Sequence, residues 1–185
     1  MGQALPKPAL RPFLAEDIPV LAAIFVAAIE ELTGEDYSQA QQEAWASAAD
    51  DEEAFGKRLA SELTLIATLQ NSPVGFASLK GADHIDMLYV HPGAAGQGVA
   101  SMLIEALEKL ASGRGAKALT VDASDNASEF FLKRGYVATI LAGEATDFAD
   151  CQIERAEQSN VENRVIDVFQ RQRHGVVLSI LMHEG

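Results

Sequence analysis

Two glycines, Gly96 and Gly98, stand between a segment with the composition of a β-strand, His84–Val90, and a segment with helical periodicity that begins at Val99. Glycines leave the backbone amides at the start of a helix uncrowded. These amides, together with the positive end of the helix dipole, attract phosphate oxygens. The arrangement therefore predicts that a phosphate-bearing ligand binds at this loop.

Three known glycine-rich patterns compete for the loop. A P-loop requires Lys where Val99 stands, which excludes its phosphate-transfer chemistry. A dinucleotide fingerprint matches only weakly, because Gly96–Ser101 lies several residues beyond the end of its strand and hairpins precede it. The coenzyme A pattern Q/R-x-x-G-x-G/A matches at Gly98 and Ala100 but has Ala95 at its first position.

The elements that must position this loop can be predicted on both sides of it. Before the strand, periodicity and turn residues predict an edge strand at 10–14, helices at about 16–31, 38–47 and 50–62, and a hairpin formed by 63–69 and 74–80. After the loop they predict a helix from Val99, a strand at 118–124, a helix capped by Ser124 or Asp125 and ended by Gly135, and segments at 136–141, 165–171 and 176–182 that favour strands.

This order of elements indicates the α+β class. We expect a single domain over residues 1–185, with one parallel β-α-β crossover inside a mixed, mostly antiparallel central sheet flanked by helices. The polar, acidic stretch 143–163 is predicted to be an insertion before the final hairpin.

Composition limits the classes of partner. With 14 basic and 27 acidic side chains the net charge is −13, which disfavours nucleic acid and anionic membranes as partners. The apolar run Ile18–Ile29 is too short to cross a bilayer. The chain has one cysteine, Cys151, so no disulfide can form within it, and we expect a cytoplasmic protein without a metal ion at its site.

With these residues in hand, the chain resembles the GNAT superfamily of N-acetyltransferases. The resemblance rests on the pattern YVHPxxxGxGVAxxLI at 89–104, the strand residues VDAS at 121–124, and ASEFFLKRGY at 127–136. It implies a sheet that splays apart at the strand that holds the cosubstrate acetyl-CoA. The resemblance extends over about residues 10–182.

The resemblance also implies how acetyl-CoA would be held. The pantetheine arm would pair with the backbone of Leu88, Tyr89 and Val90, and the following loop would surround the pyrophosphate. The residues of this loop are Ala95, Gly96, Gln97, Gly98, Val99, Ala100 and Ser101. Relatives often have Asn at the position of Ser124 and a Phe-Tyr pair at the positions of Phe130 and Phe131.

The implied reaction is the direct attack of an amine on the thioester carbonyl. Asp86 and His84 are the candidate catalytic residues: Asp86 would act as the base for the amine proton, and His84 is expected on the same strand face. A backbone amide near Leu88–Val90 would meet the oxyanion. A salt-bridged structural role for Asp86 is an equal alternative. The family's Tyr, which protonates the leaving thiolate, is Phe131 here, so another acid or water must act.

Substrate recognition is expected between the first two helices. The motif DYSxxQxxAW, which a subset of bacterial relatives carries, places Tyr37 and Trp45 as candidate contacts to a small-molecule or peptide amine, although aromatic residues at this spacing also suit simple packing. Ala95 and Phe131 leave open a non-catalytic acyl-CoA-binding or regulatory module, and an enzyme with a nucleotide cofactor is a weaker alternative. A homodimer is a further expectation.

Overall fold

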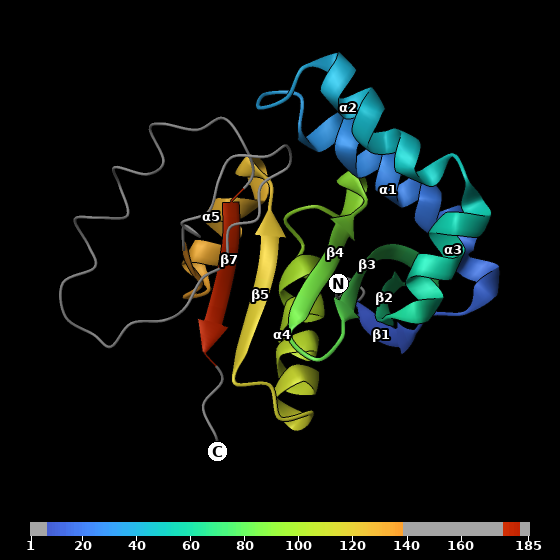
Figure 1. Cartoon of the computed structure of the whole chain (residues 1–185). Helices are drawn as coiled ribbons and strands as arrows, with labels where there is room; N and C mark the ends of the chain where they lie inside the picture. The colour runs from blue at the N-terminus through green and yellow to red at the C-terminus, as the bar shows by residue number, and fades with distance from the viewer. Residues whose placement is uncertain (1–6, 139–175, 182–185) are drawn as a thin grey trace, which may run out of the picture.

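The computed structural model describes residues 7–138 and 176–181 (Figure 1). The predicted insertion at 143–163, the first arm of the final hairpin at 165–171 and Cys151 lie outside this range. The strands are β1 Ala9–Pro12, β2 Leu63–Leu69, β3 Ser72–Lys80, β4 His84–Val90, β5 Ala118–Ala123, β6 Val137–Ala138 and β7 Val176–Leu181. The α-helices are α1 Ile18–Leu32, α2 Gln39–Ala46, α3 Glu52–Ser61, α4 Val99–Gly113 and α5 Asp125–Lys133.

The strands form one sheet in the order β1-β2-β3-β4-β5-β7-β6. All neighbours are antiparallel except β4 and β5, which are parallel and joined through α4. The predicted α+β class and the single parallel crossover are therefore confirmed. In the part of the chain that the structure describes, no helix is long and apolar enough to span a membrane.

The parallel ladder between β4 and β5 is very short. It contains only the pairs His84↔Thr120 and Ile85↔Val121, although β4 continues to Val90. Beyond Ile85 the two strands diverge, so the edge of β4 that faces β5 has no partner strand there among the described residues. This is the splay that the resemblance implies.

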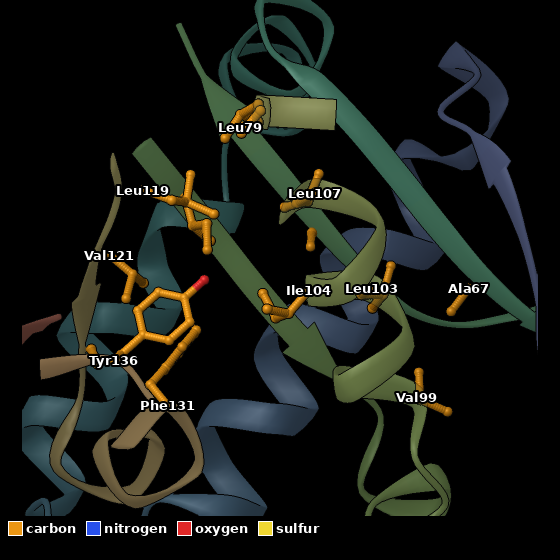
Figure 2. Close-up of a cluster of buried hydrophobic side chains, with 14 of the residues drawn as sticks. Ala67, Leu79, Val99, Leu103, Ile104, Leu107, Leu119, Val121, Phe131 and Tyr136 are labelled. Atoms are coloured by element: carbon orange, nitrogen blue, oxygen red, sulfur yellow. The ribbon is translucent and has the colours of Figure 1, made fainter. Parts of the chain in front are cut away.

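Helices cover both faces of the sheet, so two apolar layers hold β4 in place. On one face α4 and α5 bury a cluster that includes Leu103, Leu107 and Phe131 (Figure 2). On the other face α1, α2 and α3 bury a cluster that includes Phe25 and Phe55. The arrangement explains the strongly apolar α1, which packs flat on β3 and β4.

A β-bulge interrupts β4 at Asp86. In the pairing with β3, Ser78 lies opposite Met87 and Leu79 lies opposite Ile85, so Asp86 has no partner. The alternation of side chains along β4 changes at this point. Ile85 packs in the α4 layer while Met87 packs in the α1 layer, although two residues along a regular strand face the same side.

The hairpin between β2 and β3 is tighter than the sequence predicts. β3 begins at Ser72 and not at Val74, because Gln70 and Asn71 form a two-residue turn with φ angles of 51° and 68°. Positive φ at both positions is typical of the type I′ turn, whose twist matches that of the strands. Pro73 fits within β3 because it lies next to an irregularity in the ladder between β2 and β3.

Gly75 allows β3 to approach the strand that ends at the glycine loop. A Cβ atom at this position would lie 2.9 Å from the Tyr89 carbonyl oxygen and 3.1 Å from Val99 Cγ1. We predict that Gly75→Ala lowers the free energy of unfolding by roughly 1–3 kcal/mol, because a backbone oxygen cannot move aside cheaply. Urea denaturation measures this change.

Gly113→Ala is the matched control. It lies at the end of α4, and a Cβ atom there would meet nothing within 4 Å. Alanine at a helical position should leave the unfolding free energy unchanged or raise it by up to about 1 kcal/mol. Equal effects of the two substitutions would contradict the packing described for Gly75.

Candidate active site

A cleft opens where β4 and β5 diverge. Strands β4 and β5 form its base, and the end of α1, the side of α2 and the start of α5 surround it. Its lining residues are Ala28, Ile29, Leu32, Thr33, Trp45, Ile85, Asp86, Met87, Leu88, Tyr89, Val90, Val121, Asp122, Ser124, Asn126 and Phe131. The cleft therefore contains backbone groups of β4, two carboxylates and aromatic side chains.

The β4 edge inside this cleft can accept an extended ligand. Leu88, Tyr89 and Val90 line the cleft beyond the end of the short parallel ladder. On their other side the same residues pair with β3 and are therefore fixed in extended form. A ligand that carries amide groups could continue the sheet at this edge, as a further strand would.

The glycine loop meets the start of α4. Gly98 is the N-cap residue with a φ of 80°, it offers no capping side chain, and the first intrahelical bond runs from Met102 N to Gly98 O at 3.0 Å. The amides of the first turn, Val99–Ser101, therefore lack an intrahelical acceptor. Gly96 has a φ of 73°, and a Cβ atom at either glycine would meet nothing within 4 Å. The helix start thus has the geometry of an anion site.

Side chains of the loop stabilise its shape. Gln97 Nε2 donates to the Gly93 carbonyl at 2.9 Å, and the Gly93 amide donates to His91 Nδ1 at 3.1 Å. His91 thus acts on the loop and not on the cleft. Ala95 is exposed and contributes no polar group, so the binding capacity of this loop resides in its backbone.

Asp86 lines the cleft and is held by a cation from the helix behind it. Arg58 of α3 donates to Asp86 Oδ2 from Nε at 2.8 Å and from Nη2 at 2.6 Å. The Asp86 side chain is only 10% exposed, whereas that of Arg58 is 50% exposed. Asp86 follows Ile85, which packs in the α4 layer, so the alternation of side chains places Asp86 on the face that α3 covers.

His84 lies beside the cleft. Its Nδ1 is 2.8 Å from Thr120 Oγ1, and its Nε2 is 3.7 Å from Asp122 Oδ2. Both partners belong to β5, whereas the partner of Asp86 belongs to α3. His84 is not among the residues that line the cleft, but Asp122 is. The structure therefore connects His84 to the point where the two strands begin to diverge.

Trp45 and Tyr89 line one side of the cleft, and Tyr37, which is not among the lining residues, packs on Trp45. Trp45 Nε1 donates to the Tyr89 hydroxyl at 3.2 Å, and the rings of Tyr37 and Trp45 meet edge to face with centroids 5.7 Å apart. Phe25 and Phe76 pack on the Tyr89 ring. Burial raises the pKa of Tyr89 to about 12, although the hydrogen bond from Trp45 acts in the opposite direction.

Ser124 begins α5, but its hydroxyl does not cap the helix. It donates instead to the side-chain oxygen of Asn126, whose Nδ2 donates to the Leu32 carbonyl at the end of α1 at 3.2 Å. Asn126 thus joins the two helices across the cleft. Asn126 lines the cleft together with Ser124.

Phe131 and Phe130 differ in their surroundings. Phe131 is buried, lines the cleft and packs edge to face on Tyr136. Phe130 lies outside the cleft lining, with the Arg134 guanidinium 5.8 Å from its ring centroid. The Tyr136 hydroxyl donates to Glu108 Oε1 at 3.2 Å, and burial raises its pKa. Tyr136 therefore packs in the α4 layer and bonds to α4 through Glu108.

Sequence reasoning missed Arg58, Asp122 and Asn126. Asp122 follows Val121 in the VDAS segment, and a polar residue near the end of a buried strand was a usable signal. Arg58 and Asn126 gave none, because each looks like an ordinary exposed residue of an amphipathic helix. Only the folded chain brings Asn126 to the cleft and Arg58 into contact with Asp86.

Comparison with known proteins shows which family the chain resembles. A sequence model described as the acetyltransferase (GNAT) domain matches residues 33–151. The chain is 37% identical over 127 residues to an uncharacterized N-acetyltransferase, YafP, of Escherichia coli, covering 69% of this chain and 79% of that protein.

Two solved structures are similar over nearly the whole chain. A GCN5-related N-acetyltransferase from Rhodopseudomonas palustris is 52% identical, with a TM-score of 0.76 over 98% of this chain and all (100%) of that one. The PaiA N-acetyltransferase of Thermoplasma acidophilum, solved with coenzyme A, is 14% identical and shares the fold, with a TM-score of 0.70 over 95% of this chain and 99% of that one. Together with the match over 33–151, these similarities show that the chain belongs to the GNAT family of acetyltransferases.

Proposed function

We propose that the cleft between β4 and β5 is the active site of this N-acetyltransferase, and that it transfers the acetyl group of acetyl-CoA to a primary amine of a small molecule or peptide. The observation that carries the proposal is the unpaired β4 edge, which leads directly to an uncapped helix N-terminus. No observation favours the alternative of a non-catalytic acyl-CoA-binding module.

The described residues suit acetyl-CoA as a cosubstrate. Pantetheine carries two amides in an extended chain, which match the edge formed by Leu88, Tyr89 and Val90. The pyrophosphate requires several N–H donors, which the amides of Gly96–Ser101 supply without side chains. Ala95 removes one customary contact, so we expect weakened but not abolished binding.

The first step of the proposed reaction is the loss of a proton from the substrate ammonium group. An amine with a pKa of ~10 is mostly protonated at neutral pH and cannot attack. The N–H bond of the ammonium breaks towards the Asp86 carboxylate, and the nitrogen lone pair forms a bond to the thioester carbonyl carbon. The oxyanion that develops is stabilised by a backbone amide of β4 near Leu88–Val90.

Collapse of the tetrahedral intermediate breaks the C–S bond. The electron pair leaves on the coenzyme A sulfur, and the nitrogen loses its second proton to give a neutral amide. A thiol has a pKa near ~8.5, so a thiolate is an adequate leaving group. We propose that water protonates it, since Phe131 has no hydroxyl and the Tyr136 hydroxyl is bound to Glu108. One proton is released to solvent in each turnover.

Tyr37 and Trp45 are proposed to contact the acceptor. Trp45 lines the cleft together with Asp86, and Tyr37 packs edge to face on Trp45. Aromatic faces next to a carboxylate favour a cation. His84 is proposed to maintain the start of the splay through Thr120, with no direct part in proton transfer.

We further propose one domain over 1–185, a cytoplasmic location and a homodimer.

Asp86→Asn should lower kcat by roughly 100-fold or more, because the amide cannot accept the amine proton. The assay is release of the coenzyme A thiol with a panel of small amines and peptides. Asp83→Asn is the matched control, because this exposed carboxylate lies in the turn that precedes β4. This variant should retain wild-type activity. A wild-type rate for Asp86→Asn would remove Asp86 from the mechanism.

Trp45 is the only tryptophan of the chain, so intrinsic fluorescence reports on this cleft. We predict that acetyl-CoA or an accepted amine changes its emission in a saturable way, because either ligand displaces water next to the indole. Trp45→Phe should remove the signal and raise KM for the amine. An unchanged spectrum at acetyl-CoA concentrations that saturate calorimetric binding would place the ligand elsewhere.

A further inference from the structure

The side-chain amide of Gln42 joins two helices beside the cleft. Gln42 belongs to α2, and its Nε2 donates to the Ile29 carbonyl at 3.0 Å and to the Glu30 carbonyl at 3.3 Å, both near the end of α1. The same nitrogen donates to Thr33 Oγ1 at 2.9 Å, and this hydroxyl in turn donates to the Ile29 carbonyl at 2.6 Å. One amide group thus serves three acceptors at the end of α1.

The end of α1 needs such donors. The last carbonyl groups of a helix lack intrahelical partners, and the last turn of α1 contains no basic side chain that could supply N–H groups. Ile29 and Thr33 line the cleft, so the turn that Gln42 satisfies is also part of the cleft wall. The position of α2 is therefore tied to this wall through Gln42.

Gln42 shares one face of α2 with Trp45. The two residues are three positions apart, which places them side by side on a helix. Both are half-buried, whereas Gln39 and Gln41 are exposed. Trp45 lines the cleft and donates from Nε1 to the Tyr89 hydroxyl at 3.2 Å. The face of α2 that is bonded to α1 is thus the face that carries the indole.

Apolar packing alone holds α2 weakly. The helix has only eight residues, Gln39–Ala46, and among them, all of which the structure describes, only Ala46 is buried. A helix of this length is marginal unless tertiary contacts fix it. The bonds from Gln42 to α1 therefore have a large share in deciding where α2, and with it Trp45, lies.

We propose that Gln42 is a positioning residue of the acceptor site, whose amide fixes α2 on the end of α1 so that Trp45 stays in the cleft beside Tyr89. This inference rests on the proposed function, in which Trp45 contacts the amine. Gln42 does not line the cleft, so it acts through Trp45. Within the described residues its amide bonds to the end of α1 and not to the β4 edge or the glycine loop, so the binding of acetyl-CoA should not depend on it.

Gln42→Glu is the test variant, because it keeps the shape of the side chain but replaces the donor with a carboxylate. This carboxylate repels the Ile29 and Glu30 carbonyls and the negative end of the α1 dipole. We expect KM for an accepted amine to rise roughly tenfold, while kcat and KM for acetyl-CoA change less than about twofold. The emission of Trp45 in the free protein should shift to longer wavelength, because the indole becomes more exposed to water.

Gln41→Glu is the matched control. Gln41 is the adjacent residue of α2, and its Oε1 accepts from Ser38 N at 2.9 Å and from Ser38 Oγ at 2.8 Å. A carboxylate at this position keeps both bonds, as a capping box allows, and adds the same negative charge to the same helix. Its KM values and Trp45 emission should match those of the wild type. Equal KM values for the amine in the two variants overturn the proposal, and so does a parallel rise in KM for acetyl-CoA in Gln42→Glu.

A double-mutant cycle tests whether Gln42 acts through Trp45. In a Trp45→Ala background, adding Gln42→Glu should change KM for the amine by less than about twofold, because the contact that Gln42 positions is already absent. The full effect of Gln42→Glu in that background overturns the proposal, since it shows that Gln42 influences the amine by another route.

Fluorescence separates failure of this inference from failure of the proposed function. If the wild type acetylates no amine, the proposed function fails, whereas a shift of emission in Gln42→Glu alone still supports the placement of Trp45 by Gln42. Acetyl transfer together with an unmoved emission in Gln42→Glu refutes the positioning role alone. If this variant does not fold, Gln42→Ala takes its place, with Gln39→Ala on the exposed face of α2 as its control and the same expected outcomes.

Discussion

The structure depends on one interruption of hydrogen bonding: β4 and β5 pair over two residues and then part. Buried backbone donors and acceptors without partners are costly, so a strand edge exposed inside a domain is a defined feature and not a packing defect. Here the edge is held open by α1 and α2 on one side and by α5 on the other. An extended, amide-bearing ligand would remove that cost, which supports the proposed binding of the cosubstrate at this edge.

The remaining parts of the site follow from how β4 is held. Its antiparallel pairing with β3 and the two apolar layers keep it rigid while its other edge stays free. Asp86 lies on the α3 side of the strand, where Arg58 bonds to its carboxylate. At the end of the strand, the glycine loop places the start of α4 next to the same edge. In the proposed function, this one strand would provide the edge for the cosubstrate, the proton acceptor and the connection to the phosphate site.

The sequence was sufficient for the parts of the site that depend on local pattern. The strand, glycine loop and helix from His84 onward follow from composition and periodicity, and the glycines have the positive φ angles that their role requires. The parallel pairing of β4 and β5 was predictable as well, because a helical segment connects the two strands in the sequence. The family resemblance rests on these same residues, and the comparisons confirm it.

The parts that the sequence could not show depend on contacts between distant segments. The bulge at Asp86 arises from the register with β3, which no pattern within β4 reveals. Arg58 and Asn126 resemble solvated polar residues until the fold brings Arg58 into contact with Asp86 and Asn126 to the cleft. The reversal between Ile85 and Met87 has the same origin, because strict alternation fails at a bulge.

Hydrogen–deuterium exchange with and without acetyl-CoA measures whether the cosubstrate pairs with the open edge of β4. We predict slower exchange at the amides of residues 86–90 and 99–101 on binding, with no change in the β2–β3 hairpin, whose amides are already paired. Unchanged exchange at 86–90, under conditions where calorimetry shows acetyl-CoA bound, would contradict the claim that the cosubstrate completes the open edge of β4.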